Sequence, residues 1–468
     1  MKPWKILFLL LLLSHFPLQA LSFTPSGLLE IHTINVQQGS ATLIIGPDGT
    51  TILMDGGNNG KGRSEVVPYL QSIGLMPQDG LDYMIVSHLH ADHCGGLDEV
   101  IQAGYDVWKR IYDNGSDYWT ATVQDFKDAA ASTSAGPSLK IPLGTVIPLG
   151  KCARVTCVVV DGEVLGHGPV PDAQNNENDR SVGILIEHLN FEYLFTGDLG
   201  GGEADSACTG RSTNQVDVET PLSQSLMRSG IAALLGSEGV EVLHVNHHGS
   251  ESSMNRDYMN LLSPQVALIS VGDGQNSNWN HPRKGVVENV LHAQASCITA
   301  DSTLVLQTEE GYPAGSQTSY ADYCVGDIVI KTEGRTTYHI EATGEVSQGP
   351  VEVSEASLPR VFRLEEVSFY DSSPGVASFE LKQNYPNPFS CTTTILYQIP
   401  IRSYVSLKIF DNAGRLVRTL VEGEVQEGVT PVFWDGHNDM RQKVSNGVYF
   451  YRFQGKDFGE SKKILLLR

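Results

Sequence analysis

Short apolar runs rich in β-branched residues alternate with segments of helical spacing between about residues 28 and 343. The runs predicted as strands are LEIHTINV, ATLIIG, TTILMD, DYMIVS, ARVTCVVV, SVGILIEH, EYLFTG, VEVLHVN and QVALISVG. Helical spacing occurs in EVVPYLQSIG, DYWTATVQDFKDAAAST and RDYMNLLS. Because strands that alternate with helices favour sheets covered by helices, this part of the chain is predicted to be an α/β domain.

A chain of 468 residues is too long for one ordinary domain. Residues 344–378 are acidic, poor in strand patterns and contain SSPG, which is typical of a linker. In residues 379–468 the runs VSLKIF and NGVYFYRF alternate with period two, and the turn signals NAG and WDG separate such runs. This segment is predicted to form a small all-β sandwich.

Residues 1–20 have the pattern of a cleaved signal peptide. Lys2 and Lys5 precede the apolar run Ile6–Leu13, and Ala20 is a small residue at a suitable cleavage point. The run is shorter than the ~20 residues that span a bilayer, and no later stretch approaches that length. The mature chain is therefore expected outside the cytoplasm, without a stable membrane span.

Charge and cysteine content add two constraints. The formal net charge of -22 disfavours a tight nucleic-acid binder, although a local basic groove remains open. Seven cysteines, an odd number, leave at least one free or intermolecular thiol in an exported chain. Cys152 and Cys157 flank a strand-like segment and form one candidate disulfide, and Cys297 with Cys324 forms another.

The turn SHLHADHCGG, which follows the apolar run LDYMIV, gathers four residues of metal-ligand type. His88 and His90 are two residues apart at a strand end, so both imidazoles can face one ion. Asp92 and His93 follow on the turn and can face a second ion. Imidazole with carboxylate suits zinc, with manganese or iron as alternatives. A polar turn without metal is the weaker interpretation, because such a cluster is costly unless it is paired.

H-x-H-x-D-H is the signature of the metallo-β-lactamase superfamily, and the chain resembles that family in further segments. NFEYLFTGDL looks like the family segment whose aspartate bridges two metals. VEVLHVNHHGSESS and ALISVGDGQNSNWNHP are similar to the nuclease-like domain of ComEC DNA-uptake proteins and to phosphorylcholine esterases. The resemblance covers residues 28–343, including a closing hairpin in GDIVIKTEGRTTYHIE, and implies an αββα sandwich.

The resemblance also implies a set of site residues. The implied metal ligands are His88, His90, Asp92, His93, Asp198 and His281, and the implied catalytic residues are Asp92, Asp198 and His248. His248 is implied to contact the substrate phosphate or to protonate the leaving oxygen, and its neighbour His247 has an open role. Asp55 is implied to orient a ligand histidine, with a turn-capping aspartate as the alternative.

One departure from the family concerns the third imidazole of the first metal. Lactamase-type and glyoxalase-type members place a histidine where this chain has NNENDRSVGILIE. Asn178 or Asp179 can supply an oxygen there, and His167 lies further upstream in a loop that would have to return to the site.

The long polar loops 161–180 and 200–217 are predicted to be lids or binding loops, or else disordered surface insertions.

These patterns together predict a secreted two-metal hydrolase of phosphoester bonds, an extracellular nuclease or phosphodiesterase acting on DNA or phospho-conjugates. Two divalent ions that share Asp198 would activate a water as hydroxide and clamp the phosphate oxygens. The missing histidine disfavours β-lactam or thioester hydrolysis. The alternatives are a lactonase or β-lactamase-type hydrolase, and a surface binding protein that has lost its activity.

Residues 379–468 resemble the type A sorting domain of type IX secretion substrates, an immunoglobulin-like sandwich related to flagellar hook-cap proteins. The markers are NYPNPF, DNAGRLV, WDG, NGVYFYRF and the terminal KKILLLR. The resemblance implies export through the periplasm, recognition by the type IX secretion machinery, and a final location at the cell surface or in the medium. An ordinary adhesive or spacer sandwich is the alternative.

Overall fold

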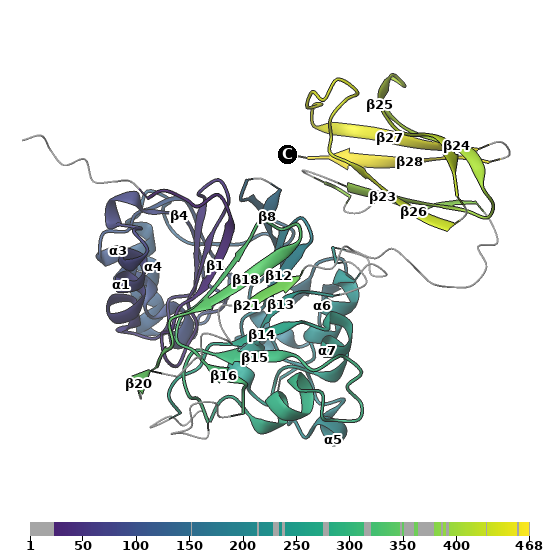
Figure 1. Cartoon of the computed structure of the whole chain (residues 1–468). Coiled ribbons are helices and arrows are strands. Elements are labelled where there is room, and N and C mark those ends of the chain that lie inside the picture. Colours follow the sequence, from purple (N-terminus) through teal and green to yellow (C-terminus); the bar gives the residue numbers. More distant parts are fainter. Residues whose placement is uncertain are drawn as a thin grey trace, which may run out of the picture.

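The computed structural model describes residues 23–150, 152–212, 215–227, 234–235, 239–274, 280–312, 320–346, 349–350, 360–363, 379–384, 387–389, 393–426, 428–455 and 458–467. Their strands form two large sheets in an N-terminal unit and two smaller sheets in a C-terminal unit (Figure 1). The predicted signal peptide and most of the predicted linker lie outside these residues. Among the described residues, no helix is long and apolar enough to cross a membrane.

Each of the two large sheets mixes antiparallel and parallel strands. The first has the order β21 (Arg360–Arg363), β18 (Thr337–Ala342), β17 (Ile328–Thr332), β1 (Leu29–Thr33), β2 (Thr42–Ile45), β3 (Thr51–Met54), β4 (Leu81–Ile85), β5 (Val107–Asp113) and β6 (Leu139–Lys140). The second has the order β10 (Gly168–Pro169), β9 (Glu163–Val164), β8 (Ala153–Val160), β11 (Gly183–His188), β12 (Phe191–Phe195), β13 (Val242–His244), β14 (Val266–Ile269), β15 (Leu304–Gln307) and β16 (Tyr323–Cys324), and β7 (Val146–Pro148) pairs with β8. The strands from β3 to β6 are parallel, and so are those from β12 to β16.

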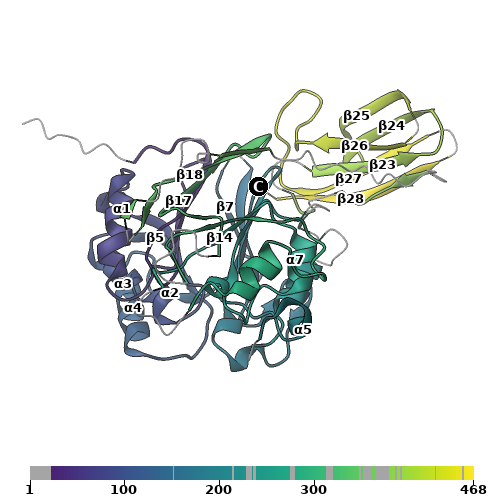
Figure 2. The ribbon, with the colours of Figure 1, turned by 60° about the horizontal axis from the view of Figure 1, so that its bottom comes forward.

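Helices cover the outer faces of both sheets. They are α1 (Val67–Ser72), α2 (Ala91–Cys94), α3 (Leu97–Gln102), α4 (Ala121–Ala131), α5 (Ser206–Thr209), α6 (Glu219–Leu226) and α7 (Arg256–Leu262), with shorter or irregular helical segments at Gly62–Val66, Pro77–Asp79, Ala173–Asn175, Asn178–Arg180, Asn246–Gly249 and Gly285–Leu291. In Figures 1 and 2, α1, α3 and α4 lie on one side of the unit and α7 lies on the other. The layers are therefore helix, sheet, sheet, helix, as predicted.

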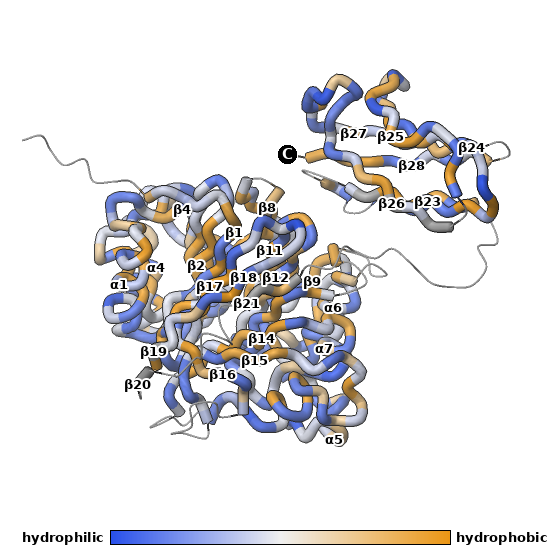
Figure 3. Tube along the Cα trace, in the orientation of Figure 1, coloured by the Kyte–Doolittle hydropathy of each residue, from blue (hydrophilic) through white to orange (hydrophobic). Residues whose placement is uncertain are grey.

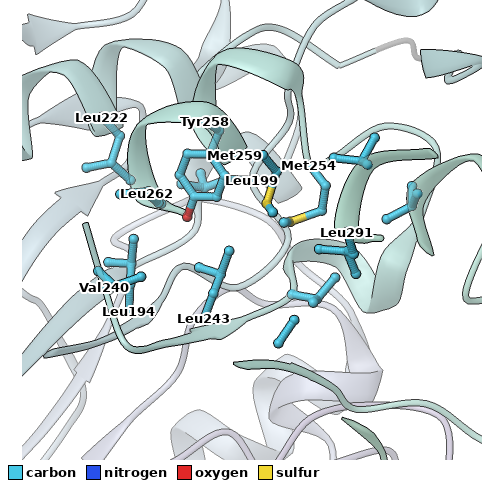
Figure 4. Packing of buried hydrophobic residues seen from close by; sticks show 14 of the residues in the cluster. Leu194, Leu199, Leu222, Val240, Leu243, Met254, Tyr258, Met259, Leu262 and Leu291 are labelled. Atoms are coloured by element: carbon cyan, nitrogen blue, oxygen red, sulfur yellow. The ribbon is translucent and has the colours of Figure 1, made fainter. Parts of the chain in front are cut away.

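Alternation along the strands explains these layers. In β3, Ile52 and Met54 point into the core between the sheets, while Leu53 packs under the helices of its own side. In β12, Tyr193 and Phe195 point into the same central core, while Leu194 joins the core beneath α6 and α7 (Figure 4). A strand buried on both faces has a continuous apolar sequence, as in β14, whose sequence VALI is fully buried and coloured as hydrophobic in Figure 3.

Two predictions about chain segments need correction. Arg360–Arg363, predicted to be linker, adds a strand to the first sheet, and the ring of Phe362 stacks on Tyr338 at 4.8 Å between centroids. The first unit therefore extends beyond residue 343, and it also contains the hairpin β19 (Glu345–Val346) and β20 (Gly349–Pro350). For the described residues of the loops 161–180 and 200–217, the alternative of disordered insertions is wrong, since the first loop contains β9 and β10 and the second contains α5. The alternative of lids or binding loops stays a prediction.

The C-terminal unit is the predicted β-sandwich. One sheet has the order β22 (Glu380–Leu381), β23 (Thr393–Ile399) and β26 (Gly428–Trp434). The other has the order β25 (Leu416–Val425), β24 (Ser403–Asp411), β27 (Gly447–Gln454) and β28 (Gly459–Leu466). Alternate residues of β24 and β27 point into a separate core around Trp434.

The disulfide predictions were wrong. Cys208 pairs with Cys297, which links α5 to the segment after Gly285–Leu291. Cys157 lies in the core between the sheets and Cys324 lies on β16, and both are buried free thiols, as is Cys94. Sequence separation did not show which face of a strand each cysteine occupies. The expectation of at least one free thiol is confirmed.

Candidate metal site

The candidate site lies where the carboxyl ends of strands from both sheets meet. Asp55 follows β3, and the turn with His88 and His90 follows β4 in the first sheet. Asp198 follows β12 and His248 follows β13 in the second sheet. Parallel strands end at a common edge of a sheet, so chain segments far apart in sequence bring their polar residues together there.

Asp55 fixes the ring of His93. Its carboxylate accepts hydrogen bonds from the backbone N–H and the hydroxyl of Ser87, both at 2.7 Å. The same carboxylate lies 2.8 Å from Nδ1 of His93. Asp55 is fully buried and the three groups that it binds are donors, so Nδ1 of His93 carries the proton. Nε2 of His93 is therefore the atom that faces the site.

His248 is oriented in the same way by a backbone carbonyl. Its Nδ1 donates to the carbonyl oxygen of Ser270 at 2.7 Å, which leaves Nε2 without a proton in the neutral ring. That Nε2 lies 3.5 Å from the carboxylate of Asp92 and 3.2 Å from Nε2 of His93. Two imidazole nitrogens that both present lone pairs at this distance repel each other, unless a proton or a cation lies close to them.

Asp198 is the centre of the cluster. Its carboxylate oxygens lie 3.4 Å from His93, 3.7 Å from His88, 3.7 Å from His247 and 3.9 Å from His248. His88, His93 and Asp198 each place a donor atom within 4.8 Å of the other two, and Asp92, His93 and His248 form a second such group. Both groups contain His93, whose inner nitrogen Nε2 has one lone pair and can therefore bind only one cation.

The charges in the cluster shift one another. Burial opposes the imidazolium of His93, but the carboxylates of Asp198 and Asp55 outweigh it and raise its pKa well above the usual range. Burial and the positive charge of His93 hold the pKa of His88 well below its usual range. For Asp198, burial opposes ionisation, but the surrounding imidazoles hold its pKa well below its usual range. The buried carboxylates thus attract positive charge strongly.

His247 has an acceptor on one nitrogen and faces the site with the other. Its Nδ1 lies 2.9 Å from the side-chain oxygen of Gln215 and 2.7 Å from the hydroxyl of Ser252. Because the Gln215 oxygen can only accept, Nδ1 of His247 carries the proton and Nε2 presents a lone pair toward Asp198. Both His247 and His248 have the left-handed backbone conformation, with φ of 49° and 54°. Such a conformation is uncommon outside glycine and is held here by packing around the turn.

The other implied residues lie at the edge of the cluster. Nδ1 of His90 lies 3.0 Å from Nε2 of His88. His281 belongs to neither three-residue group, and its ring lies 5.7 Å from His247 and 6.3 Å from His248 between centroids. Among the described residues, Nδ1 of His281 is buried without a hydrogen-bond partner. The geometry thus places His248, rather than His281, with Asp92 and His93.

The three candidates for the missing ligand occupy different environments. Asp179 is engaged in three hydrogen bonds, because its carboxylate accepts from the backbone of Gly200 and Val216 and from the amide of Gln215. Burial raises the pKa of Asp179 to about 6. Asn178 lies beside His247, with its Nδ2 3.4 Å from Nε2, and its Oδ1 is buried without a partner among the described residues. His167 is exposed in the turn between β9 and β10, and its ring contacts the carbonyl of Gly168.

The donor set fits divalent cations. Imidazole nitrogens and carboxylates are the ligands that zinc and similar ions take in proteins, and here they converge from the ends of β4, β12 and β13. Each of the rings of His93, His247 and His248 has an acceptor on its other nitrogen, the arrangement that orients metal-binding histidines. Sequence reasoning missed Ser87, Gln215, Ser252 and Ser270. For Ser87 and Ser252 a signal existed, since each adjoins a histidine motif.

Family models agree with the fold. Residues 34–272, just over half of the chain, match the model described as the metallo-beta-lactamase superfamily. The chain therefore belongs to this superfamily, whose members are metal-dependent hydrolases. Residues 399–457, in the C-terminal sandwich, match the FlgD Ig-like domain.

Curated relatives and solved structures are more distant. The chain is 26% identical over 282 residues to "Recombination protein 2" of Haemophilus influenzae, covering 58% of this chain and 27% of the relative. It is 22% identical over 268 residues to "ComE operon protein 3" of Bacillus subtilis, covering 57% and 29%. The chain thus spans less than a third of the length of these relatives. Similar solved structures include human tRNase Z, short form (12% identical, TM-score 0.30, covering 52% and 92%), and Zn(2+)-bound PqqB from Methylobacterium extorquens (15%, 0.28, 50% and 76%).

Proposed function

We propose that this chain is a metal-dependent phosphoester hydrolase, a nuclease or phosphodiesterase that acts outside the cytoplasm. The observation that carries the proposal is the position of the Asp198 carboxylate, which lies within 3.9 Å of His88, His93, His247 and His248. One carboxylate in this position can be shared by two ions. Bound divalent ions supply a nucleophile by lowering the pKa of water, and they stabilise negative charge on a phosphoryl group.

The ligand set that we propose differs from the sequence prediction at one position. We retain His88, His90, Asp92, His93 and Asp198 and add His248, because its Nε2 lies beside Asp92 and His93. Hydrogen bonds to neighbouring groups orient the rings of two of these histidines. Asp55 and the carbonyl of Ser270 keep the protons on the outer nitrogens of His93 and His248, so that both inner nitrogens stay available as donors.

We assign to His281 the substrate contact that the sequence had suggested for His248. Its Nδ1 is buried and has no hydrogen-bond partner among the described residues, which costs free energy unless a ligand supplies one. Its ring lies beside His247 and His248, at the edge of the cluster. In this role His281 donates a hydrogen bond to a phosphoryl oxygen or to the leaving oxygen.

Two further observations support a phosphoester substrate. The position of the third imidazole in lactamase-type relatives is filled here by NNENDRS, where Asn178 offers an uncharged oxygen beside His247. In addition, one relative carries the name "Recombination protein 2", which points to DNA. We therefore place nucleic acids and small phosphodiesters ahead of lactones and β-lactams.

Hydrolysis assays with the zinc-loaded or manganese-loaded chain test this function. We expect turnover of DNA or of bis(p-nitrophenyl) phosphate, and none of a lactone or of nitrocefin. Asp198→Ala should abolish turnover, while Asp128→Asn, on an exposed position of α4, should leave it unchanged. Turnover of lactones alone, or turnover of phosphodiesters that survives Asp198→Ala, would contradict the proposal.

We also propose that residues 1–20 direct export and that residues 379–468 direct sorting by a type IX secretion system. The support is the signal pattern at the N-terminus and the motifs NYPNPF and KKILLLR around a FlgD-like sandwich. Expression in a bacterium with this secretion system tests the proposal. The full chain should reach the cell surface or medium, and a chain without residues 379–468 should stay in the periplasm. Equal secretion of both chains would contradict it.

A further inference from the structure

The loop between β5 and α4 exposes two aromatic side chains next to the metal-ligand turn. Residues 114–120, with the sequence NGSDYWT, form neither helix nor strand. The ring of Tyr118 meets the ring of His90 edge to face, with 5.2 Å between centroids, and is 38% exposed. The next residue, Trp119, is 70% exposed. Exposed aromatic residues beside a reactive centre are available to a ligand.

Buried hydrogen bonds hold this loop against the ligand turn. The carboxylate oxygen Oε1 of Glu177 accepts from the amide of Asn114 at 2.8 Å and from the backbone N–H of Leu89 at 2.9 Å. Leu89 lies between His88 and His90, so a single carboxylate oxygen joins the aromatic loop to the metal turn. Asn114 is fully buried and also accepts from the backbone of Ser116 at 3.0 Å. The position of Tyr118 is therefore set before any ligand arrives.

The charges around the loop favour stacking over phosphate attraction. Arg180 is already paired with Asp117 at 3.3 Å and with Asp161 at 2.7 Å. The whole chain carries a net charge of -22, which opposes electrostatic attraction of a nucleic-acid backbone. An aromatic ring binds a base through its π face and needs no counter-charge.

We propose that Tyr118 and Trp119 form a base-stacking subsite for single-stranded nucleic acid, next to the scissile phosphodiester. The subsite deepens the proposed function and rests on it for the identity of the scissile bond. Trp119 directly follows Tyr118, whose ring contacts His90. A quaternary ammonium group is the competing ligand, but it is normally bound by a cage of aromatic rings, and this loop offers two residues in sequence.

Binding of fluorescent oligonucleotides to the metal-free chain tests the subsite without turnover. The probes are a short oligothymidylate and an abasic strand of the same length, which has the same phosphates and no bases. The chain should bind the oligothymidylate roughly tenfold more tightly, since stacking on an aromatic residue is worth ~1–3 kcal/mol per base. The affinity should also depend weakly on salt, because few counterions are released.

Substitutions separate the subsite from general binding. Trp119→Ala and Tyr118→Leu should each lower the ratio of the affinities for oligothymidylate and for the abasic strand toward one. Tyr118→Phe, which keeps the ring, should retain the wild-type ratio. Trp108→Phe is the matched control, because Trp108 is 50% exposed on β5 and donates to the carbonyl of Asp79 rather than to the site. Equal binding of both strands by the wild type, or a preference that survives Trp119→Ala combined with Tyr118→Leu, would refute the subsite.

Two outcomes distinguish this inference from the proposed function. If phosphocholine displaces the oligothymidylate at lower concentration than thymidine monophosphate does, the rings bind a choline group and the base-stacking proposal is wrong. If the metal-loaded chain cleaves neither strand while the metal-free chain still prefers bases, the subsite stands and the proposed hydrolysis fails.

Discussion

At the scale of single residues, the site depends on which nitrogen of each histidine carries a proton. His93, His247 and His248 each have an oxygen acceptor on Nδ1, so each presents Nε2 toward Asp198. These acceptors belong to a carboxylate, an amide and a backbone carbonyl. None of these three acceptors is among the proposed metal ligands. Each one keeps the proton on Nδ1 and so leaves the lone pair of Nε2 available to a cation.

The first prediction concerns Asp55, whose carboxylate holds His93. In Asp55→Asn, either the amide must turn its oxygen toward His93 and its N–H groups toward the Ser87 donors, or the ring must move. We expect metal affinity to fall by roughly 10- to 100-fold, as for other residues that orient a ligand. Competition with a chelator of known affinity measures this change. Asp128→Asn is the control, and equal affinity of both variants and wild type would show that Asp55 does not orient a ligand.

The sequence indicated which polar residues gather at the strand ends, while their roles as metal ligands stay a prediction. The spacing of His88, His90, Asp92 and His93 sufficed, because a single turn after a strand brings them together. Asp198 was predictable for the same reason. The exchange of roles between His248 and His281 that we propose could not be inferred from the sequence, because a strand end does not reveal the left-handed backbone that places the ring of His248 beside Asp92.

At the scale of elements, the turn after β13 is held by a buried polar network. Glu219 at the start of α6 accepts from the amide of Asn246 and from the backbone of Met254 and Asn255, each at 2.7 Å. The hydroxyl of Ser253 donates to the carbonyl of Asn246 at 2.7 Å. These contacts fix Asn246, the residue before His247 and His248. Through Glu219, α6 therefore stabilises the turn that carries both histidines.

The second prediction follows from the burial of Glu219, which raises its pKa to about 7. Between about pH 4.5 and about pH 7 the folded chain keeps a proton that the unfolded chain has lost, so this group lowers the unfolding free energy as pH rises. Glu219→Gln should therefore show a flatter pH dependence than wild type in urea unfolding. The absolute stability of the variant can differ from that of wild type, because the introduced side-chain amide would face the N–H of Asn255, which donates to a carboxylate oxygen of Glu219 in wild type. The same slope in both proteins would contradict the prediction.

Whole elements were easier to predict than their edges. All nine strand runs identified in the sequence became strands, because their β-branched residues are buried between layers. Arg360–Arg363 was missed, since a four-residue edge strand in an acidic segment has almost no periodicity. The structured parts of loops 161–180 and 200–217 were missed because long-range contacts stabilise them. Arg211, for example, is buried and pairs with Asp205.

At the scale of the whole molecule, the N-terminal unit places parallel strands of both sheets with their carboxyl ends at one edge. This arrangement allows residues from β3, β4, β12 and β13 to share one site. Among the residues that the structure describes, the C-terminal unit has its own core and shares no strand with the large sheets. The proposed hydrolysis and the proposed sorting can therefore belong to separate units of the chain.

The third prediction concerns the disulfide between Cys208 and Cys297. It closes a segment in which the two cysteines are 89 residues apart, a large loop to constrain in the unfolded chain. Replacing both cysteines by serine should lower the unfolding free energy by about 2 to 5 kcal/mol. Urea unfolding of the variant measures the loss, and wild type in reducing agent should lose at least as much, because Cys152 is also in a disulfide that would be reduced. Unchanged stability in both experiments would mean that the bond contributes nothing to the folded state.

The central claim is that the Asp198 cluster holds divalent ions, and anomalous X-ray scattering from crystals of the metal-loaded chain tests it most directly. We predict two anomalous peaks beside the Asp198 carboxylate. One should lie ~2.0–2.1 Å from Nε2 of His88, and the other at the same distance from Nε2 of His248. Absence of peaks at Asp198, or a peak bound to His281 with His248 turned away, would contradict the account.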